Sequence, residues 1–153
     1  MRRIALAAGL IALTIAIAPQ GRAAPDGMIV KTSAHSVSAT LDKLESVLEK
    51  NGIRVFLRVD HTAGAKRVGL DLPATQLLIF GNPKLGTPLM QTERTVAIDL
   101  PMKALAYADA DGDVHLAYND PAYFARRHGI TGRDGVIDKM TGALDKLTDA
   151  ATQ

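Results

Sequence analysis

The sequence predicts an α+β fold in which helices pack on one face of a mostly antiparallel sheet. Two observations favour this class. Segments with helical spacing of apolar residues alternate with strand-like segments along the first part of the chain. The later part contains a β-hairpin, whose two strands are antiparallel, and the series closes with one more helix.

Two long helices are predicted from apolar residues that recur every three or four positions. The first begins after Ser36, which can accept free amide hydrogens of the first turn, and ends at Asn51–Gly52. The second covers Asp134 to Ala150, although Gly142 inside it costs about 1 kcal/mol. Their apolar stripes are, in order, Val37, Leu41, Leu44 and Leu48, then Ile137, Met140, Leu144 and Leu147.

Strands are predicted over residues 28–32, 53–60 and 75–80. In the second of these, polar and apolar residues alternate, so we expect one face to contain Ile53, Val55, Leu57 and Val59. Short helices are expected between the strands, over residues 61–69, from Asn82–Pro83 onward, and from Asn119–Asp120–Pro121 to His128–Gly129.

A β-hairpin is predicted around Asp111–Gly112, because Asp-Gly is typical of two-residue hairpin turns. A two-residue turn pairs Tyr107 with Leu116 and Leu105 with Tyr118. We therefore expect these four side chains to share one face of the sheet.

The first 23 residues have the three parts of a secretory signal peptide. Arg2 and Arg3 provide the basic start, residues 4–18 form an apolar run, and small residues precede a cleavage site after Ala23. The run is shorter than the roughly 20 residues that span a bilayer, so we expect cleavage rather than a membrane anchor. The mature protein would then be periplasmic or secreted, with no membrane contact. The arginine pair leaves Sec and twin-arginine export both open.

Residues 24–153 are enough for one domain with a core. We expect an α+β domain over residues 24–130 and a C-terminal helical extension over residues 131–153. Loss of the three signal-peptide arginines takes the formal net charge from +2 to −1. With 4% aromatic residues and no basic patch, nucleic acid is not an expected partner. The sequence contains no cysteine, so no disulfide contributes to stability.

A loop rich in glycine and proline follows the apolar strand that ends at Phe80. Gly81 and Gly86 have the spacing of a phosphate-binding loop, which also requires a lysine and a hydroxyl residue. Thr87 and Pro88 stand at those places, and proline has neither an ammonium nor a hydroxyl group. We therefore expect a structural strand-to-helix turn rather than a phosphate site.

No metal site and no cofactor are expected. The acidic run from Asp109 to Asp113 has carboxylates at alternate positions, but Val114 stands where a calcium-binding loop needs glycine. None of the four histidines has the close spacing typical of zinc ligands. His128, at a helix end, is expected to interact with the last carbonyl groups of that helix.

Asp60–His61 is the candidate catalytic or binding pair. It lies where a strand ends and a helix begins, and it places a carboxylate beside an imidazole that titrates near neutral pH. Lys66 follows about one helical turn later. The alternative, that Asp60 or Thr62 caps the helix, stays open.

The stretch VDHTAGAKRVGLDLPATQLLIFGNPKLGTPLM, together with DLP before the hairpin, resembles the bacterial and archaeal family described as domain of unknown function 302. The resemblance runs from about Met28 to His128 and leaves out the helix from Asp134. It implies an α+β fold of the TATA-binding-protein-like type and a homodimer, and it implies no particular activity. Some relatives have cysteine after Leu-Pro, where this chain has Met102, which puts a thiol role in doubt.

These features predict an exported module that binds a small ligand between the Asp60–His61 loop and the Gly81–Pro88 loop. The expected ligand contacts are Asp60, His61, Lys66, Gly81, Asn82 and Thr87. One alternative is an enzyme in which His61 is the general base and Asp60 orients it. Another alternative is a structural dimer without a ligand.

Overall fold

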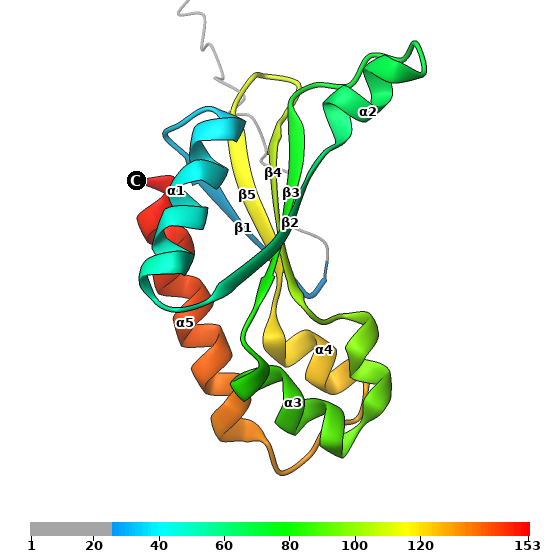
Figure 1. The fold of residues 1–153 in the computed structure, drawn as a ribbon, viewed down its shortest axis with the longest axis vertical. Coiled ribbons are helices and arrows are strands. Elements are labelled where there is room, and N and C mark those ends of the chain that lie inside the picture. The colour runs from blue at the N-terminus through cyan, green and yellow to red at the C-terminus, as the bar shows by residue number, and fades with distance from the viewer. Residues whose placement is uncertain (1–25) are drawn as a thin grey trace, which may run out of the picture.

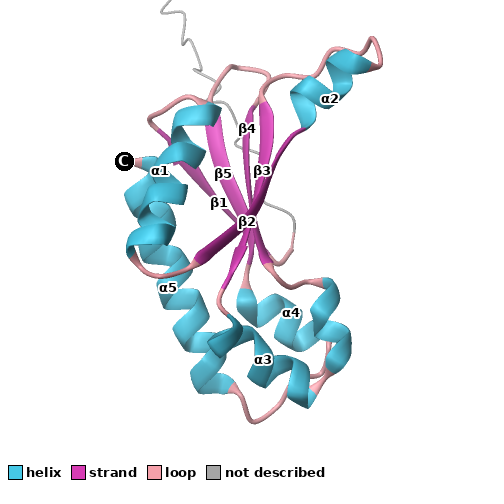
Figure 2. Cartoon of the chain, in the orientation of Figure 1, coloured by secondary structure: helices cyan, strands magenta, loops and turns pink. Residues whose placement is uncertain are grey.

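The structure is a computed structural model that describes residues 26–153, so the predicted signal peptide over residues 1–23 lies outside it. A five-stranded antiparallel sheet has the strand order β1-β5-β4-β3-β2, and its long helices lie on one side (Figures 1 and 2). In chain order the elements are β1 (Met28–Ser33), α1 (Val37–Lys50), β2 (Arg54–Asp60), α2 (His61–Arg67), β3 (Thr75–Gly81), α3 (Pro83–Thr92), the 3-10 helix η1 (Arg94–Ile98), β4 (Met102–Ala108), β5 (Val114–Asn119), α4 (Pro121–Arg127) and α5 (Asp134–Thr152).

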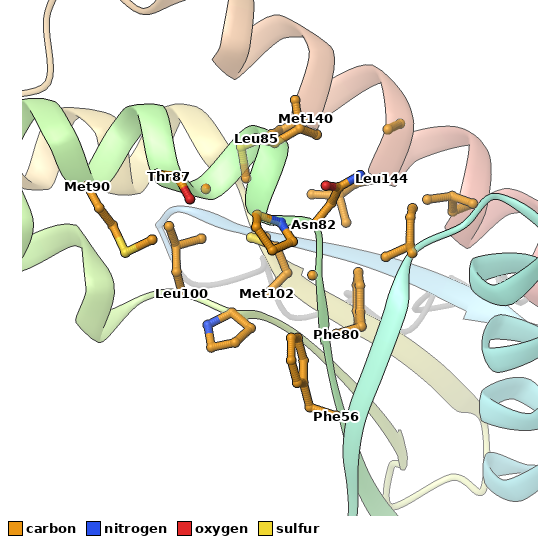
Figure 3. Close-up of a pocket in the computed structure, with 17 residues that line it drawn as sticks. Phe56, Phe80, Asn82, Leu85, Thr87, Met90, Leu100, Met102, Met140 and Leu144 are labelled. Carbon is orange, nitrogen blue, oxygen red and sulfur yellow. The ribbon is translucent and has the colours of Figure 1, made fainter.

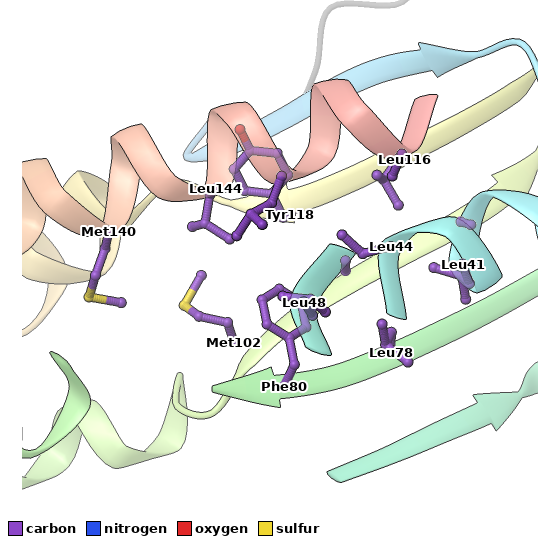
Figure 4. Packing of buried hydrophobic residues seen from close by; sticks show 14 of the residues in the cluster. Leu41, Leu44, Leu48, Leu78, Phe80, Met102, Leu116, Tyr118, Met140 and Leu144 are labelled. Atoms are coloured by element: carbon purple, nitrogen blue, oxygen red, sulfur yellow. The ribbon is translucent and has the colours of Figure 1, made fainter. Parts of the chain in front are cut away.

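The hydrophobic core lies between the sheet and the two long helices, α1 and α5, which pack against each other (Figure 4). Both predicted apolar stripes are buried there, which confirms the assignment of these helices. α5 belongs to the same core as the rest of the domain, because Met140 and Leu144 pack with the buried residues of the sheet. None of the helices in residues 26–153 is both long and apolar enough to cross a membrane.

Side-chain caps begin the helices where the sequence predicts them. The hydroxyl of Ser36 accepts the N–H of Ala39 at the start of α1. Asp120 accepts the N–H of Ala122 at 2.9 Å at the start of α4. Each such cap contributes about 1 kcal/mol, so the sequence specifies these helix starts locally.

The β4–β5 hairpin is present, but its register differs from the prediction by one residue. Tyr118 lies opposite Ala104, not opposite Leu105. Since neighbouring side chains point to opposite faces, the shift turns Leu105 and Tyr107 away from the helices. The prediction that they share a face with Leu116 and Tyr118 was therefore wrong.

The reason for the shift is the length of the turn. The N–H of Asp109 donates to the carbonyl of Asp113 at 2.9 Å, so the loop is longer than two residues. The carboxylate of Asp109 accepts the N–H groups of Asp111 at 3.0 Å and Asp113 at 2.9 Å. His115 donates from Nε2 to the same carboxylate at 2.7 Å, and this bond lowers the pKa of Asp109 below its ordinary value. The acidic run is thus a turn built around one carboxylate.

A β-bulge between Val55 and Leu57 corrects a second expectation. Val55 faces the helices, whereas Leu57 and Val59 face the opposite side, because the bulge inserts one residue into the alternation. Arg58 consequently points toward α1, where its guanidinium binds Asp42. The predicted common face of the four apolar residues was wrong from the bulge onward.

An ion-pair cluster fastens α5 to β1 at the edge of the sheet. The ammonium of Lys31 donates to the carboxylates of Asp145 at 2.7 Å and Asp149 at 2.6 Å. Burial alone would lower the pKa of Lys31, but the hydrogen bonds to the two carboxylates outweigh burial and raise this pKa. The cluster therefore stabilises the packing of α5 against β1 at any pH at which the two carboxylates are ionised.

Candidate functional site

A cavity of about 270 Å³ lies at the end of the sheet where β3 ends and β4 begins, between α3 and α5 (Figure 3). It is therefore surrounded by segments that are far apart in the sequence. The residues that line it are Ile53, Phe56, Phe80, Gly81, Asn82, Pro83, Leu85, Gly86, Thr87, Met90, Leu100, Pro101, Met102, Met140, Ala143, Leu144 and Leu147.

The β3–α3 connection forms one wall of this cavity, and Asn82 determines its shape. The Oδ1 atom of Asn82 accepts the N–H of Lys84 at 2.9 Å. The backbone carbonyl of Asn82 accepts the N–H groups of Leu85 at 3.0 Å and Gly86 at 3.1 Å. The first amides of α3 are thus already bonded within the chain, so they are not free to hold a phosphate.

The two glycines of this wall provide space rather than an unusual backbone conformation, since neither has a positive φ. A Cβ atom on Gly81 would lie 3.3 Å from Cβ of Pro101, which is a tight contact. A Cβ atom on Gly86 would lie 3.5 Å from Leu100, which is an ordinary contact distance. A side chain at position 86 can therefore be accommodated locally while taking up part of the cavity.

The wall of the cavity is apolar apart from two side chains, Asn82 and Thr87, and none of the lining residues is ionisable. The Oδ1 atom of Asn82 is used in capping α3, which leaves its Nδ2 group available to a ligand. Three methionines, Met90, Met102 and Met140, add flexible side chains that adapt to ligands of different shape. The site can hold an apolar molecule and offer it hydrogen bonds from the Asn82 amide and the Thr87 hydroxyl.

Of the six predicted ligand contacts, Gly81, Asn82 and Thr87 line the cavity, and the other three do not. The expectation that the two loops meet was wrong. β2 and β3 are antiparallel, and Asp60 at the end of β2 pairs with Gln76 near the start of β3. Asp60 and Gly81 therefore lie at opposite ends of the same pair of strands.

Asp60 has a capping role in the structure. Its Oδ1 atom accepts the N–H of Ala63 at 2.8 Å at the start of α2, and its Oδ2 atom accepts a bond from Gln76 at 3.3 Å. His61 and Lys66 are exposed on α2, away from the cavity. His61 was expected to contact the ligand, but it does not line the cavity, because α2 projects from the other end of the sheet (Figure 1).

A partly buried polar cluster beside the cavity was not predicted. His128 donates from Nε2 to Asp99 at 2.6 Å, and its Nδ1 lies 3.0 Å from the hydroxyl of Thr95. The side chains of His128 and Asp99 are only 8% and 9% exposed. Arg127 also donates to Asp99, at 3.2 Å. The cluster fixes the chain at residue 99, immediately before Leu100 and Pro101 of the cavity wall.

The sequence held only a weak signal for this cluster. His128 stands at the end of a predicted helix, and Asp99 begins the DLP motif before the hairpin. Their contact spans 29 residues of sequence, and η1, which ends immediately before Asp99, was not predicted. The contributions of Phe56, Met140 and Leu144 to the cavity were missed for the same reason, since tertiary packing alone brings them together.

Comparison with known proteins identifies the fold and the family. A sequence model of the family described as domain of unknown function DUF302 matches residues 29–147, which includes most of α5. Among solved structures, the chain is similar to an uncharacterized conserved DUF302 protein from Bacillus stearothermophilus, with a TM-score of 0.75 and 17% identity. The likeness covers 83% of this chain and 99% of that chain, and at this identity it shows the fold alone.

Curated relatives come from Brucella. The chain is 47% identical over 134 residues to proteins named fluoride-specific ion channel FluC 1 in Brucella suis and in Brucella abortus. The match covers 87% of this chain but only 53% and 50% of those two proteins. The chain thus spans about half the length of the curated relatives it matches.

The two contrasting histidines give a direct test of the site assignment. His61→Ala should change the free energy of unfolding by less than about 0.5 kcal/mol, because the side chain is exposed. His128→Ala should lower it by about 1–3 kcal/mol, because the nearly buried Asp99 and the Thr95 hydroxyl lose a partner. Urea unfolding of both variants measures the difference, and losses of equal size would contradict the placement of these two residues.

Proposed function

The chain belongs to the DUF302 family, and we propose that its domain binds a small molecule after export to the periplasm or beyond. The observation that carries this proposal is the cavity between α3 and α5. Binding sites for small molecules are concave and mostly apolar, with a few polar groups that orient the ligand. The cavity has this composition, with Asn82 and Thr87 as its polar side chains.

The chemistry of the wall favours an uncharged, largely apolar ligand. No ionisable side chain lines the cavity, so a buried charge on the ligand would lose its hydration without gaining an opposite charge. An apolar cavity of about 150 Å³ holds benzene, so 270 Å³ has room for a larger ring system or a short acyl chain. A carbonyl or ether oxygen on the ligand could accept a hydrogen bond from Nδ2 of Asn82.

The same observation weighs against the enzyme alternative with His61 as general base. A general base must come within hydrogen-bond reach of the proton that it removes. His61 lies on α2 and does not line the cavity, whose own wall contains no acid or base. Binding without turnover is therefore the function that this geometry supports best.

The relatives named fluoride channels favour a second role for the same domain. Because those proteins are about twice as long as the match, we propose that this domain serves as a ligand-sensing partner to membrane transport. Fluoride itself does not suit the cavity, since an anion there would have no cation beside it and only the Asn82 amide and the Thr87 hydroxyl to replace its hydration.

Export is tested at the N-terminus of the protein isolated from cells. We expect mature chains that begin at or near Ala24, because residues 1–23 have the charged, apolar and small-residue parts of a signal peptide. N-terminal sequencing of the periplasmic fraction provides the measurement. Chains that begin at Met1 and remain in the membrane fraction would contradict cleavage.

Ligand binding is tested with N-phenyl-1-naphthylamine, an uncharged aromatic probe whose fluorescence rises in apolar surroundings. The wild-type protein should bind it, and Gly86→Leu should weaken binding at least about tenfold, because the new side chain enters the cavity. Gly142→Leu is the matched control, since Gly142 lies in α5 with open space around it and outside the cavity. Its affinity should equal that of the wild type.

Titration with sodium fluoride should give no signal by calorimetry. Two results would contradict the proposal. One is equal probe affinity in the wild-type and Gly86→Leu proteins, and the other is the absence of binding to the wild type, together with native mass spectra free of any co-purified molecule.

A further inference from the structure

His128 follows α4 and contacts both ends of the 3-10 helix η1. Its Nδ1 atom lies 3.0 Å from the hydroxyl oxygen of Thr95, near the start of η1. Its Nε2 atom lies 2.6 Å from Oδ2 of Asp99, directly after the end of η1. Because the imidazole is nearly buried, these two partners rather than water satisfy its nitrogens. The ring therefore bridges the two ends of η1.

On the Nδ1 side, the hydroxyl of Thr95 can only accept. Its single proton is donated to Oε1 of Glu93 at 2.9 Å, so the oxygen has no proton left for His128. The N–H of Thr95 also donates to Glu93 at 2.9 Å. These two bonds, the one from the N–H first, lower the pKa of Glu93, so its carboxylate is ionised and remains an acceptor.

On the Nε2 side, Asp99 is an acceptor as well. Its Oδ1 atom accepts from the guanidinium of Arg127 at 3.2 Å, and its Oδ2 atom faces the imidazole. With an acceptor on each side, the ring of His128 must donate from both nitrogens. A neutral imidazole has one N–H group, whereas an imidazolium has two. The hydrogen bonds of this cluster are thus complete only when His128 is positively charged.

Other charged groups surround this network without changing its proton count. The charged residues that are hydrogen-bonded to it are Glu93, Asp99, Lys103, Arg127 and Arg133. Lys103 on β4 donates to the carbonyl of Asp99 at 3.2 Å, and Arg133 before α5 donates to Thr92 at 2.9 Å. Between about pH 5.5 and about pH 8.5, carboxylates, lysine and arginine ordinarily keep their charge, whereas histidine changes its own.

The two ends of η1 lead to two parts of the cavity wall. Glu93 ends α3, whose last turns contribute Met90, and Asp99 precedes Leu100 and Pro101 (Figure 3). Loss of one ring proton removes one of the two bonds, unless Thr95 turns its hydroxyl to Nδ1 and releases Glu93. The bond that remains to Asp99 is also weaker, because its donor is no longer charged.

We propose that Glu93, Thr95, His128 and Asp99 form a proton-dependent clamp that holds the cavity wall while His128 is doubly protonated and loosens it when one proton leaves. This inference rests on the proposed function, since it assigns control to the same cavity. A wall that is fixed in advance costs less ordering when a ligand binds. Affinity should therefore be higher at low pH and fall as the ring loses its proton. Because such coupling is reciprocal, the ligand should in turn favour the charged ring.

Nuclear magnetic resonance of the protein without ligand tests the clamp by itself. At about pH 5.5, both ring N–H groups of His128 should give signals protected from exchange with water, and Thr95→Val should remove only the Nδ1–H signal. As the pH rises to about 8.5, the methyl signals of Leu100 should move with the same midpoint as the ring. A ring with a single proton at about pH 5.5, or Leu100 signals that do not follow the ring, would overturn the proposal.

The affinity for N-phenyl-1-naphthylamine, which is uncharged across this pH range, provides the second readout. The wild type should bind it at least about threefold more tightly at about pH 5.5 than at about pH 8.5. His128→Gln and Thr95→Val should each reduce this ratio below about twofold, because neither variant can complete the clamp. His61→Gln is the matched control, since His61 is exposed on α2 and does not line the cavity, and it should keep the wild-type ratio.

The two readouts separate this inference from the proposed function. If the probe binds at neither pH while Leu100 follows the ring, ligand binding is contradicted and the coupling of His128 to the wall is supported. If the probe binds equally at both pH values, or if both variants keep the wild-type ratio, the coupling is overturned and ligand binding stands. Should His128→Gln fail to fold, Thr95→Val decides, because residue 95 is exposed.

Discussion

Ala104 lies opposite Tyr118, and the other features of the fold depend on this pairing. It places the small side chains of Ala104 and Ala106 beneath the helices, both fully buried, and turns Leu105 to the opposite face. The Asp109 carboxylate holds this register by closing the turn between the two strands. A change of one residue in the pairing would exchange the two faces of β4.

The two alanines allow the helices to lie close to the middle of the sheet, and the larger side chains at its end determine where space remains. α5 continues past the end of the strands and meets α3 there, and Met102 and Met140 lie between them (Figures 3 and 4). The helices therefore close the core over the sheet but leave a cavity at its lower end in Figure 1. The Asp99–His128 pair holds the remaining wall in place.

Features of this fold could be predicted from the sequence where the interacting residues are only a few positions apart in the chain. Ser36, Asn82 and Asp120 act within three residues of their own positions, and their helices were predicted correctly for that reason. The bulge at Phe56 and the length of the Asp109 turn each add a single residue that composition and periodicity do not specify. These two extra residues decide which side chains of β2 and β4 point away from the helices, so both faces of these strands were predicted wrongly beyond the bulge and the turn.

The candidate site shows the same difference between residues that a local signal predicts and residues that only tertiary packing brings together. Gly81, Asn82 and Thr87 were predicted as ligand contacts because a strand that ends in a Gly-rich turn is a local signal, and these three residues line the cavity. Asp60 and His61 were expected to join them, but the antiparallel pairing of β2 and β3 separates the two loops by the length of the strands. Only the tertiary arrangement shows that the cavity wall is almost entirely apolar and that Asp60 and His61 lie outside it.

The register of the β4–β5 hairpin is tested most directly by nuclear Overhauser contacts in solution. The Tyr118 ring should show strong cross-peaks to the methyl group of Ala104, because the two residues lie directly opposite each other on the helix-covered face. If the Tyr118 ring instead shows cross-peaks to the methyl groups of Leu105, the hairpin has the two-residue turn and its register. That register would also bring Leu105 and Tyr107 under the helices and contradict the burial of Ala104 and Ala106 in the core.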